Sequence, residues 1–175
     1  MHKITSILLM LLISVSSISF AQTKEELKKF ALRDAKITAE ATLKKDFETV
    51  FKHTYPTIIK VMGGKEKALE LLKTTFKKIE EQGLIFEKSD IISVSEVVFE
   101  DDQYRCYVES LNQIKMNNMR IKSKSYLLGI YSEDKKIWYF LEAEKLKDKA
   151  MEEMILPNFK TGLNIPKDEV TTEQI

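Results

Sequence analysis

Gln103-Tyr-Arg-Cys-Tyr-Val-Glu-Ser-Leu-Asn-Gln-Ile-Lys-Met116 is the stretch of this chain that decides its fold. Apolar and polar residues alternate along much of it, and a period of two is typical of a strand with one buried face. We therefore expect a strand over about 103–115, with its even-numbered side chains under covering helices. The residues on that face are Tyr104, Cys106, Val108, Ser110, Asn112, Ile114 and Met116.

Three further strand-like runs flank this stretch, at about 84–99, 119–131 and 136–143. The segments between the runs are short and polar, as in Glu100-Asp-Asp102 and Ser132-Glu-Asp-Lys135. Short connections favour antiparallel neighbours. The sequence therefore predicts a curved antiparallel meander of four strands, or slightly more.

Helical periodicity precedes the strands. Thr23-Lys-Glu-Glu26 matches a capping box and predicts a helix from 24 to about 44. Further helices are expected over about 46–53, over 56–62 before Gly63-Gly64, and over 65–82 before Gly83. A last helix over about 144–155 leads toward a polar tail at 167–175. Helices followed by antiparallel strands indicate an α+β fold with the helices packed on one face of the sheet.

The run at 136–143 is apolar on both faces. Ile137, Tyr139 and Leu141 alternate with Trp138 and Phe140. Two apolar faces predict burial on both sides of this strand. We expect the outer face to pack against a second copy of the chain, which would make the protein a homodimer.

The first 21 residues have the layout of a secretory signal peptide. His2-Lys3 is basic, the residues to Ile18 are almost wholly apolar or small, and Ser19-Phe20-Ala21 has the small-x-small pattern of a cleavage site. The alternative is a retained membrane anchor, which needs about 20 apolar residues. We expect cleavage after Ala21, a secreted or periplasmic location and no stable membrane insertion. Residues 22–166 would then form a single α+β domain.

Charge is balanced once residues 1–21 are removed. Lys3 is the one charged residue among them, so 27 of the 28 basic residues remain against 27 acidic ones. A nucleic-acid partner would call for a basic stripe, so we expect none. Cys106 is the one cysteine, which predicts no internal disulfide. It is interpreted as a small buried hydrophobe, because the alternative, a nucleophile, lacks an obvious base.

Several short patterns together resemble a secreted bacterial branch of the nuclear-transport-factor-2-like superfamily. They are Tyr55-Pro56, Met62-Gly63-Gly64-Lys65, the helix ending at Gly83, the meander, Trp138-x-Phe140, Leu156-Pro157 and Leu163-Asn-Ile165-Pro166. The resemblance implies a cystatin-like cone, in which a curved sheet wraps round helices and leaves a cavity at its wide end. Members include isomerases, dehydratases, polyketide cyclases and non-catalytic binding or dimerising domains, so the fold alone does not decide the function.

His53 is a weak catalytic candidate, because an unperturbed histidine titrates near neutral pH. The alternative is a histidine at a helix C-terminus, where it favours the helix dipole. One histidine without a cluster of acids or cysteines falls short of a metal ligand set, so we predict no metal and no cofactor. Enzymes of the superfamily that shift protons commonly use an Asp or His in the cavity. The even-numbered face of 103–116 carries no acid, which weakens the enzyme hypothesis.

Tyr55, Tyr104, Trp138 and Phe140 are the candidate lining of a pocket for a small apolar ligand. The alternative for these aromatic residues is an ordinary core. Arg120, Lys122 and Lys124 share one strand face. That face is either solvated or a docking surface for an acidic partner or a polysaccharide.

These observations favour a secreted or periplasmic binding or interaction module whose ligand the sequence does not identify. One alternative is a small cavity enzyme of the isomerase, dehydratase or cyclase type, using His53 or an unplaced carboxylate. A structural dimer without a ligand is a further alternative.

Overall fold

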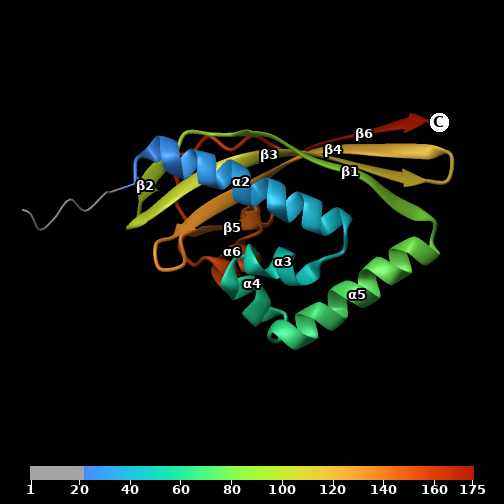
Figure 1. Ribbon diagram of the computed structural model, residues 1–175, viewed down its shortest axis with the longest axis horizontal. Coiled ribbons are helices and arrows are strands. Elements are labelled where there is room, and N and C mark those ends of the chain that lie inside the picture. The colour runs from blue at the N-terminus through green and yellow to red at the C-terminus, as the bar shows by residue number, and fades with distance from the viewer. Residues whose placement is uncertain (1–21) are drawn as a thin grey trace, which may run out of the picture.

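The computed structural model describes residues 22–175. The predicted signal peptide, residues 1–21, lies outside the described residues. The described chain has five α-helices and one six-stranded antiparallel open sheet, so the α+β class expected from the sequence is confirmed. Figure 1 shows the helices α2, α3, α4 and α5 on one side of the curved sheet.

The elements follow one another in the expected order. The helices are α2 (Lys24–Leu43), α3 (Phe47–Lys52), α4 (Pro56–Val61), α5 (Lys65–Glu81) and α6 (Lys149–Ile155), with a 3-10 turn, η1, at Ala143–Lys147. The strands are β1 (Leu84–Val94), β2 (Val98–Glu100), β3 (Gln103–Met116), β4 (Met119–Ser132), β5 (Ile137–Glu142) and β6 (Glu169–Gln174). The Thr23 side chain accepts from the Glu26 amide and the Glu26 carboxylate accepts from the Thr23 amide, so α2 begins with the predicted capping box.

The sheet is a meander in the order β1-β3-β4-β5, with every pairing antiparallel. The run expected at 84–99 forms two strands, because Ser95–Val97 leaves the regular ladder and buries Val97. The Tyr107 amide donates to Ser95 Oγ, which holds this break against β3. Two register shifts in β1, at Glu87 and Ile92, are bulges of the kind that increase strand twist.

A sixth strand occupies the segment expected only as a polar tail. β6 pairs with the first half of β4, from Met119 to Lys124, while β5 pairs with its second half. All six β6 side chains are exposed. A strand that buries no side chain has no hydrophobic periodicity, which is why the pattern of 167–175 did not predict it.

The inner face of the sheet carries the main core. The α2 residues that meet it recur at every fourth position: Leu27, Ala31, Ala35 and Ala39. A stripe of small side chains lets the helix lie close to the strands. Cys106 and Val108 of β3 pack in this cluster, so the even-numbered face is the helix-covered face, as predicted.

Gly129 lies at the tightest point of this core. A Cβ atom there would stand 3.0 Å from Cys106 Sγ, 3.2 Å from Trp138 and 3.3 Å from Phe140. Contacts that short leave no room for a larger residue, and glycine in a strand often marks such a close approach. The central strand β4 therefore depends on glycine to admit the large aromatic side chains of β5.

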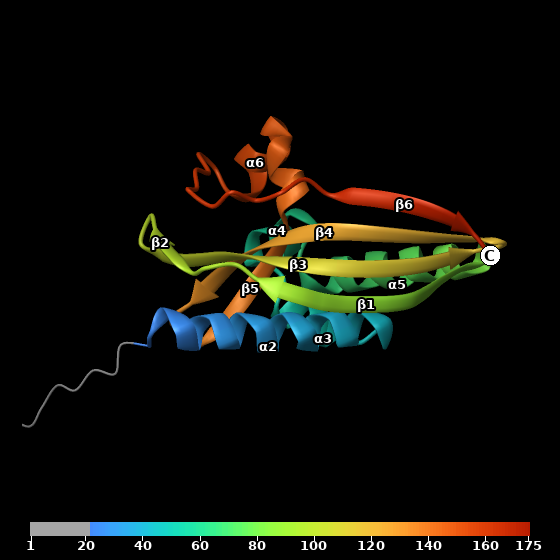
Figure 2. The ribbon, with the colours of Figure 1, turned by 90° about the horizontal axis from the view of Figure 1, so that it is seen from above.

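The outer face of the sheet is covered by the chain's own C-terminal segment. Leu128, Ile130 and Leu141 pack with Leu146 and Ile155. Figure 2 shows α6 on the opposite side of the molecule from α2, which runs beside β1. The burial of both faces of β5 thus arises within one chain. The homodimer stays a prediction, and the apolar outer face of β5 no longer requires it.

Candidate functional site

A hollow of about 390 Å³ lies between the second half of α2 and the middle of β1. Its lining comes from one face of the helix and from four consecutive strand residues. These residues are Lys36, Ala39, Glu40, Leu43, Ser89, Asp90, Ile91 and Ile92. The volume falls in the range of small-molecule sites, which begins at about 300 Å³.

The hollow begins where α2 ceases to seal the sheet. Leu27 and Ala31, at the start of the buried stripe, are fully shielded from solvent. Leu43, one turn beyond Ala39, is 36% exposed, and Ile92 on the strand is 52% exposed. Partly exposed apolar side chains on both walls leave surface that a ligand could cover.

A chain of neutral polar groups lies on the inner face of the sheet behind Ser89. The Ser89 hydroxyl donates to Asn112 Oδ1 over 2.8 Å, and Asn112 Nδ2 donates to Ser125 Oγ over 3.3 Å. Ser125 Oγ lies 2.8 Å from the Oγ of Ser110, which is buried. The network spans β1, β3 and β4, so hydrogen bonds hold Ser89 in a defined position at the hollow.

The carboxylates of this hollow are bound to lysines. Glu40 Oε1 lies 2.6 Å from Lys44 Nζ, and Asp90 Oδ2 lies 2.5 Å from Lys88 Nζ. The hydrogen bond from Lys44 lowers the pKa of Glu40, since it stabilises the charged form. A general base in this environment would need a raised pKa, so the charges suit a polar rim better than proton transfer.

His53, the catalytic candidate of the sequence, is a buried structural group. It is 2% exposed, and its Nδ1 lies 3.0 Å from the carbonyl oxygen of Trp138. A carbonyl can only accept, so Nδ1 is the donor. The Phe140 amide donates to the His53 carbonyl and the Tyr55 amide donates to the Phe140 carbonyl. His53 thus closes the free edge of β5 and does not line the hollow.

Trp138 is the centre of a buried polar cluster that the sequence did not reveal. Its amide donates to Asp34 Oδ2 over 2.9 Å, and its Nε1 donates to the Leu27 carbonyl over 3.0 Å. Asp34 is 1% exposed and pairs with Arg33 at 2.8 Å. The signal for Asp34 was its position on the apolar stripe side of α2, next to Ala35.

The four aromatic residues predicted to line a pocket lie in two core clusters. Trp138 and Phe140 are buried in the inner cluster, and Tyr104 packs against it. Tyr55 packs against the outer cluster and meets Tyr139 edge to face, with ring centroids 6.4 Å apart. None of the four lines the hollow between α2 and β1.

For Cys106 the structure supports a buried hydrophobe over a nucleophile. For the face of Arg120, Lys122 and Lys124 it supports charges paired within the chain over a docking surface. Burial raises the pKa of the Cys106 thiol, which keeps it protonated and unreactive. Arg120 and Lys122 bind Glu173, and Lys124 lies 3.6 Å from Glu109. Since each cation of this face has a carboxylate within the chain, little positive charge is left for an acidic partner.

Within residues 22–175, no group of three metal-ligating side chains comes together, and no helix is long and apolar enough to cross a membrane. Comparison with known proteins gives no match, whether with protein-family models, with curated proteins or with solved structures. The function is therefore inferred from the chemistry of the site.

Proposed function

We propose that this protein is an exported binding module that holds a small, largely apolar molecule in the hollow between α2 and β1. One observation carries the proposal: the hollow has apolar walls, and the hydrogen-bonded Ser89–Asn112–Ser125 network holds the Ser89 hydroxyl beside them. Ligand sites are typically apolar clefts with a few fixed polar groups that orient the ligand.

The uncharged polar group at the hollow, on Ser89, defines the class of ligand. Ser89 lines the hollow, and since its proton is donated to Asn112 Oδ1, its oxygen is left to accept a hydrogen bond from a hydroxyl group of the ligand. Leu43, Ile91 and Ile92 would cover an apolar ring or a short chain. Covering apolar surface stabilises the complex by about 25 cal/mol per Å², before the costs of association.

Two further parts of the proposal are the fold family and export. Helices on one face of a curved antiparallel meander are consistent with a divergent nuclear-transport-factor-2-like cone. Export with cleavage after Ala21 agrees with the start of the packed domain, because the Gln22 side chain accepts a hydrogen bond from the Tyr131 hydroxyl over 2.6 Å. N-terminal sequencing of protein recovered from the periplasm or medium should begin at Gln22, an intact Met1 would contradict cleavage after Ala21, and recovery of the protein only from the cytoplasm would contradict export.

The test of binding is a thermal-shift screen with pairs of compounds that differ by one polar group, such as menthol and menthane. A ligand that binds the folded protein alone raises Tm. We expect neutral amphipathic compounds with a hydroxyl group to raise Tm, and their hydrocarbons to raise it less. A flat response to all the hydroxyl compounds would contradict the proposal.

Ser89→Ala and Ser93→Ala form the matched pair of variants for this screen. Both serines lie on β1, but the Ser93 hydroxyl donates to Glu109 on the outer face and lies outside the hollow. Loss of the Ser89 hydroxyl should weaken binding about three- to tenfold, in line with about 1 kcal/mol for one hydrogen bond. Ser93→Ala should bind as the unchanged protein does. Equal losses in the two variants would place the ligand elsewhere.

The enzyme alternative has less support in this hollow. Its two carboxylates, on Glu40 and Asp90, are both bound to lysines, and His53 is buried at the edge of β5. A proton-transfer enzyme would require one of these groups to be free and within reach of a bound substrate. Binding without turnover of the ligand found in the screen is the expected result.

A further inference from the structure

A second hollow, of about 400 Å³, lies on the far side of α3 and α4, against β5. It shares no lining residue with the hollow between α2 and β1. Three segments that are distant in sequence meet there: the end of α3, the first turns of α4, and β5 with the turn before it. Its lining residues are Lys52, Pro56, Ile59, Lys135, Ile137 and Tyr139.

The floor of this hollow is apolar and firmly held. Ile137 and Tyr139 belong to the outer face of β5, and Tyr139 is only 8% exposed. The Tyr139 ring rests edge to face against Tyr55, and the Tyr55 amide donates to the Phe140 carbonyl. A floor fixed by the β5 backbone needs little ordering on binding, which reduces the entropic cost.

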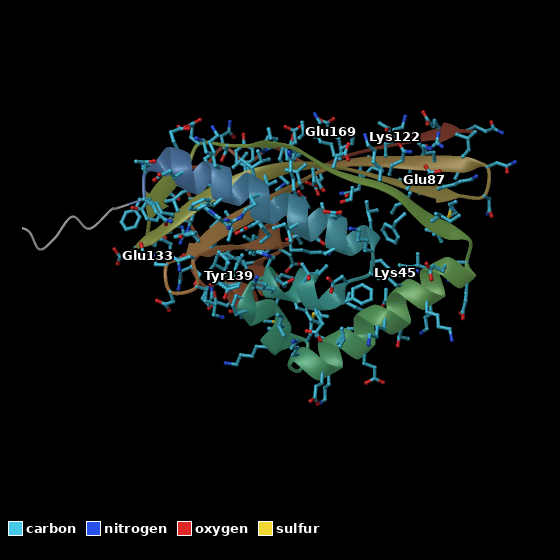
Figure 3. The ribbon with its side chains drawn as sticks, in the orientation of Figure 1. Lys45, Glu87, Lys122, Glu133, Tyr139 and Glu169 are labelled. Carbon is cyan, nitrogen blue, oxygen red and sulfur yellow. The ribbon has the colours of Figure 1, made fainter. Side chains whose placement is uncertain are left out.

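Two lysines line this hollow together with its apolar residues. Lys52 comes from α3 and Lys135 from the turn between β4 and β5. Lys135 Nζ lies 5.6 Å from the centroid of the Tyr139 ring, a cation–π distance. Tyr139, labelled in Figure 3, lies where β5 approaches α4, and Lys122 lies far from it along the sheet.

In the described part of the chain, the two lysines of this hollow have no acidic partner, unlike the basic residues of the outer face of β4. Within residues 22–175, neither Lys52 nor Lys135 lies within 4.0 Å of a carboxylate oxygen, whereas Lys122 and Lys124 are both paired. The hydrogen bond with the Tyr139 phenol raises the pKa of Lys135, and the neighbouring Asp134 raises it less. No acid lines the hollow. Two unpaired cations above an apolar floor in a chain of balanced charge favour an anion.

We propose that this second hollow binds a small apolar carboxylate, with its carboxylate between Lys52 and Lys135 and its apolar body on Ile59, Ile137 and Tyr139. The lining favours a carboxylate over a phosphate, because a dianionic phosphate costs more to strip of water beside the side chains of Ile59, Ile137 and Tyr139. The large apolar floor favours an aryl or alkyl acid over a small ion such as acetate.

The experiment is isothermal titration calorimetry of the purified protein with 4-phenylbutyrate, 4-phenylbutanol and phenyl phosphate. We expect 4-phenylbutyrate to bind, and to bind more weakly as salt is raised, because the lysines are solvated. 4-Phenylbutanol, which has the same apolar body without the charge, should bind about tenfold more weakly. No binding of 4-phenylbutyrate at millimolar concentration would overturn the proposal. Stronger binding of phenyl phosphate would overturn the choice of a carboxylate.

The variants are Lys52→Met with Lys135→Met, and Lys73→Met with Lys78→Met as the control. Methionine keeps the apolar stem and removes the charge. Lys73 and Lys78 lie on the exposed surface of α5, away from both hollows. The first pair should lose about tenfold in affinity for 4-phenylbutyrate, and the control pair should lose none. An equal affinity in the two double variants would overturn the proposal, and circular dichroism verifies that both are folded.

Discussion

The two long strands β3 and β4 have a packed half and an open half. In the packed half, from Gln103 to Ser110 and from Tyr126 to Tyr131, α2 covers the inner face and the C-terminal segment covers the outer face. In the open half, from Leu111 to Met116 and from Met119 to Lys124, no residue is fully buried. One pair of strands thus passes from a closed core into a partly solvated ribbon.

The two halves differ because different segments and side chains pack against them. The outer side of the open half carries an ion-pair network of Glu87, Arg120, Lys122 and Glu173. Figure 3 labels Glu87 and Lys122 at this end of the sheet. Its inner side faces α5, where Phe76 stacks on Phe86 with ring centroids 5.1 Å apart. The paired Ser110 and Ser125 mark the boundary between the two halves. We infer that the packed half supplies stability and that binding uses the boundary.

The same substitution, made in each half of β4, measures how much the two halves differ in their contribution to stability. Ile130 is 3% exposed in the packed half, and Ile121 is partly exposed in the open half. Ile130→Ala should cost about 3–4 kcal/mol, because it removes buried methyl groups and leaves a cavity. Ile121→Ala should cost about 1 kcal/mol. Urea denaturation measures both, and equal losses would erase the distinction.

A smaller effect is expected from Asp34, which supports the packed half from α2. Asp34→Ala should cost about 2–3 kcal/mol, because it leaves the buried Trp138 amide without an acceptor. Asp90→Ala, which removes a half-exposed carboxylate from β1, should cost at most about 0.5 kcal/mol. Denaturant midpoints compare the two. A neutral Asp34→Ala would show that the Trp138 cluster does not stabilise the packed half.

The smallest effect is the pH dependence of the open half. Hydrogen bonds from Arg120 lower the pKa of Glu87, and hydrogen bonds from Lys122 and Arg120 lower that of Glu173. A lowered folded-state pKa gives stability that is present above the unfolded value of about 4.3 and is lost as pH falls through the folded value. Arg120→Met should therefore flatten the acid loss below that pH.

Unfolding midpoints between neutral and acid pH, at low and high salt, measure this contribution. Salt screens exposed charges, so the difference between the protein and Arg120→Met should shrink as salt is added. An acid loss that is unchanged by Arg120→Met would show that these ion pairs add nothing.

The sequence predicted the packed half well, because regular periodicity reports burial. The helix over 24–44 and the buried even-numbered face of β3 were predicted, and Leu27, Ala31 and Cys106 share one core cluster. Ile137, Tyr139 and Leu141 were also predicted to be buried, with a second copy of the chain as the expected cover. The C-terminal segment of the same chain covers this face, and the homodimer stays a prediction. Periodicity shows that a face is covered and does not show by what.

The open half and the hollows were harder to predict for physical reasons. β6 is held by its backbone and by ion pairs such as Lys122–Glu173, so its side chains follow no apolar pattern. The hollow at Ser89 depends on how far α2 lies from β1, which local sequence does not encode. For Trp138 and Phe140 the sequence left both a pocket lining and a core open, and their close approach to Gly129 decides for the core.

Residue-resolved hydrogen exchange along β4 compares the packed half of the strand with its open half. Exchange in well-packed strands requires global unfolding, whereas partly solvated strands open locally. We predict that the amides of Leu128–Tyr131 exchange at the rate of global unfolding, and that those of Arg120–Lys124 exchange at least about tenfold faster. Uniform protection along the whole of β4 would contradict the division into a packed and an open half.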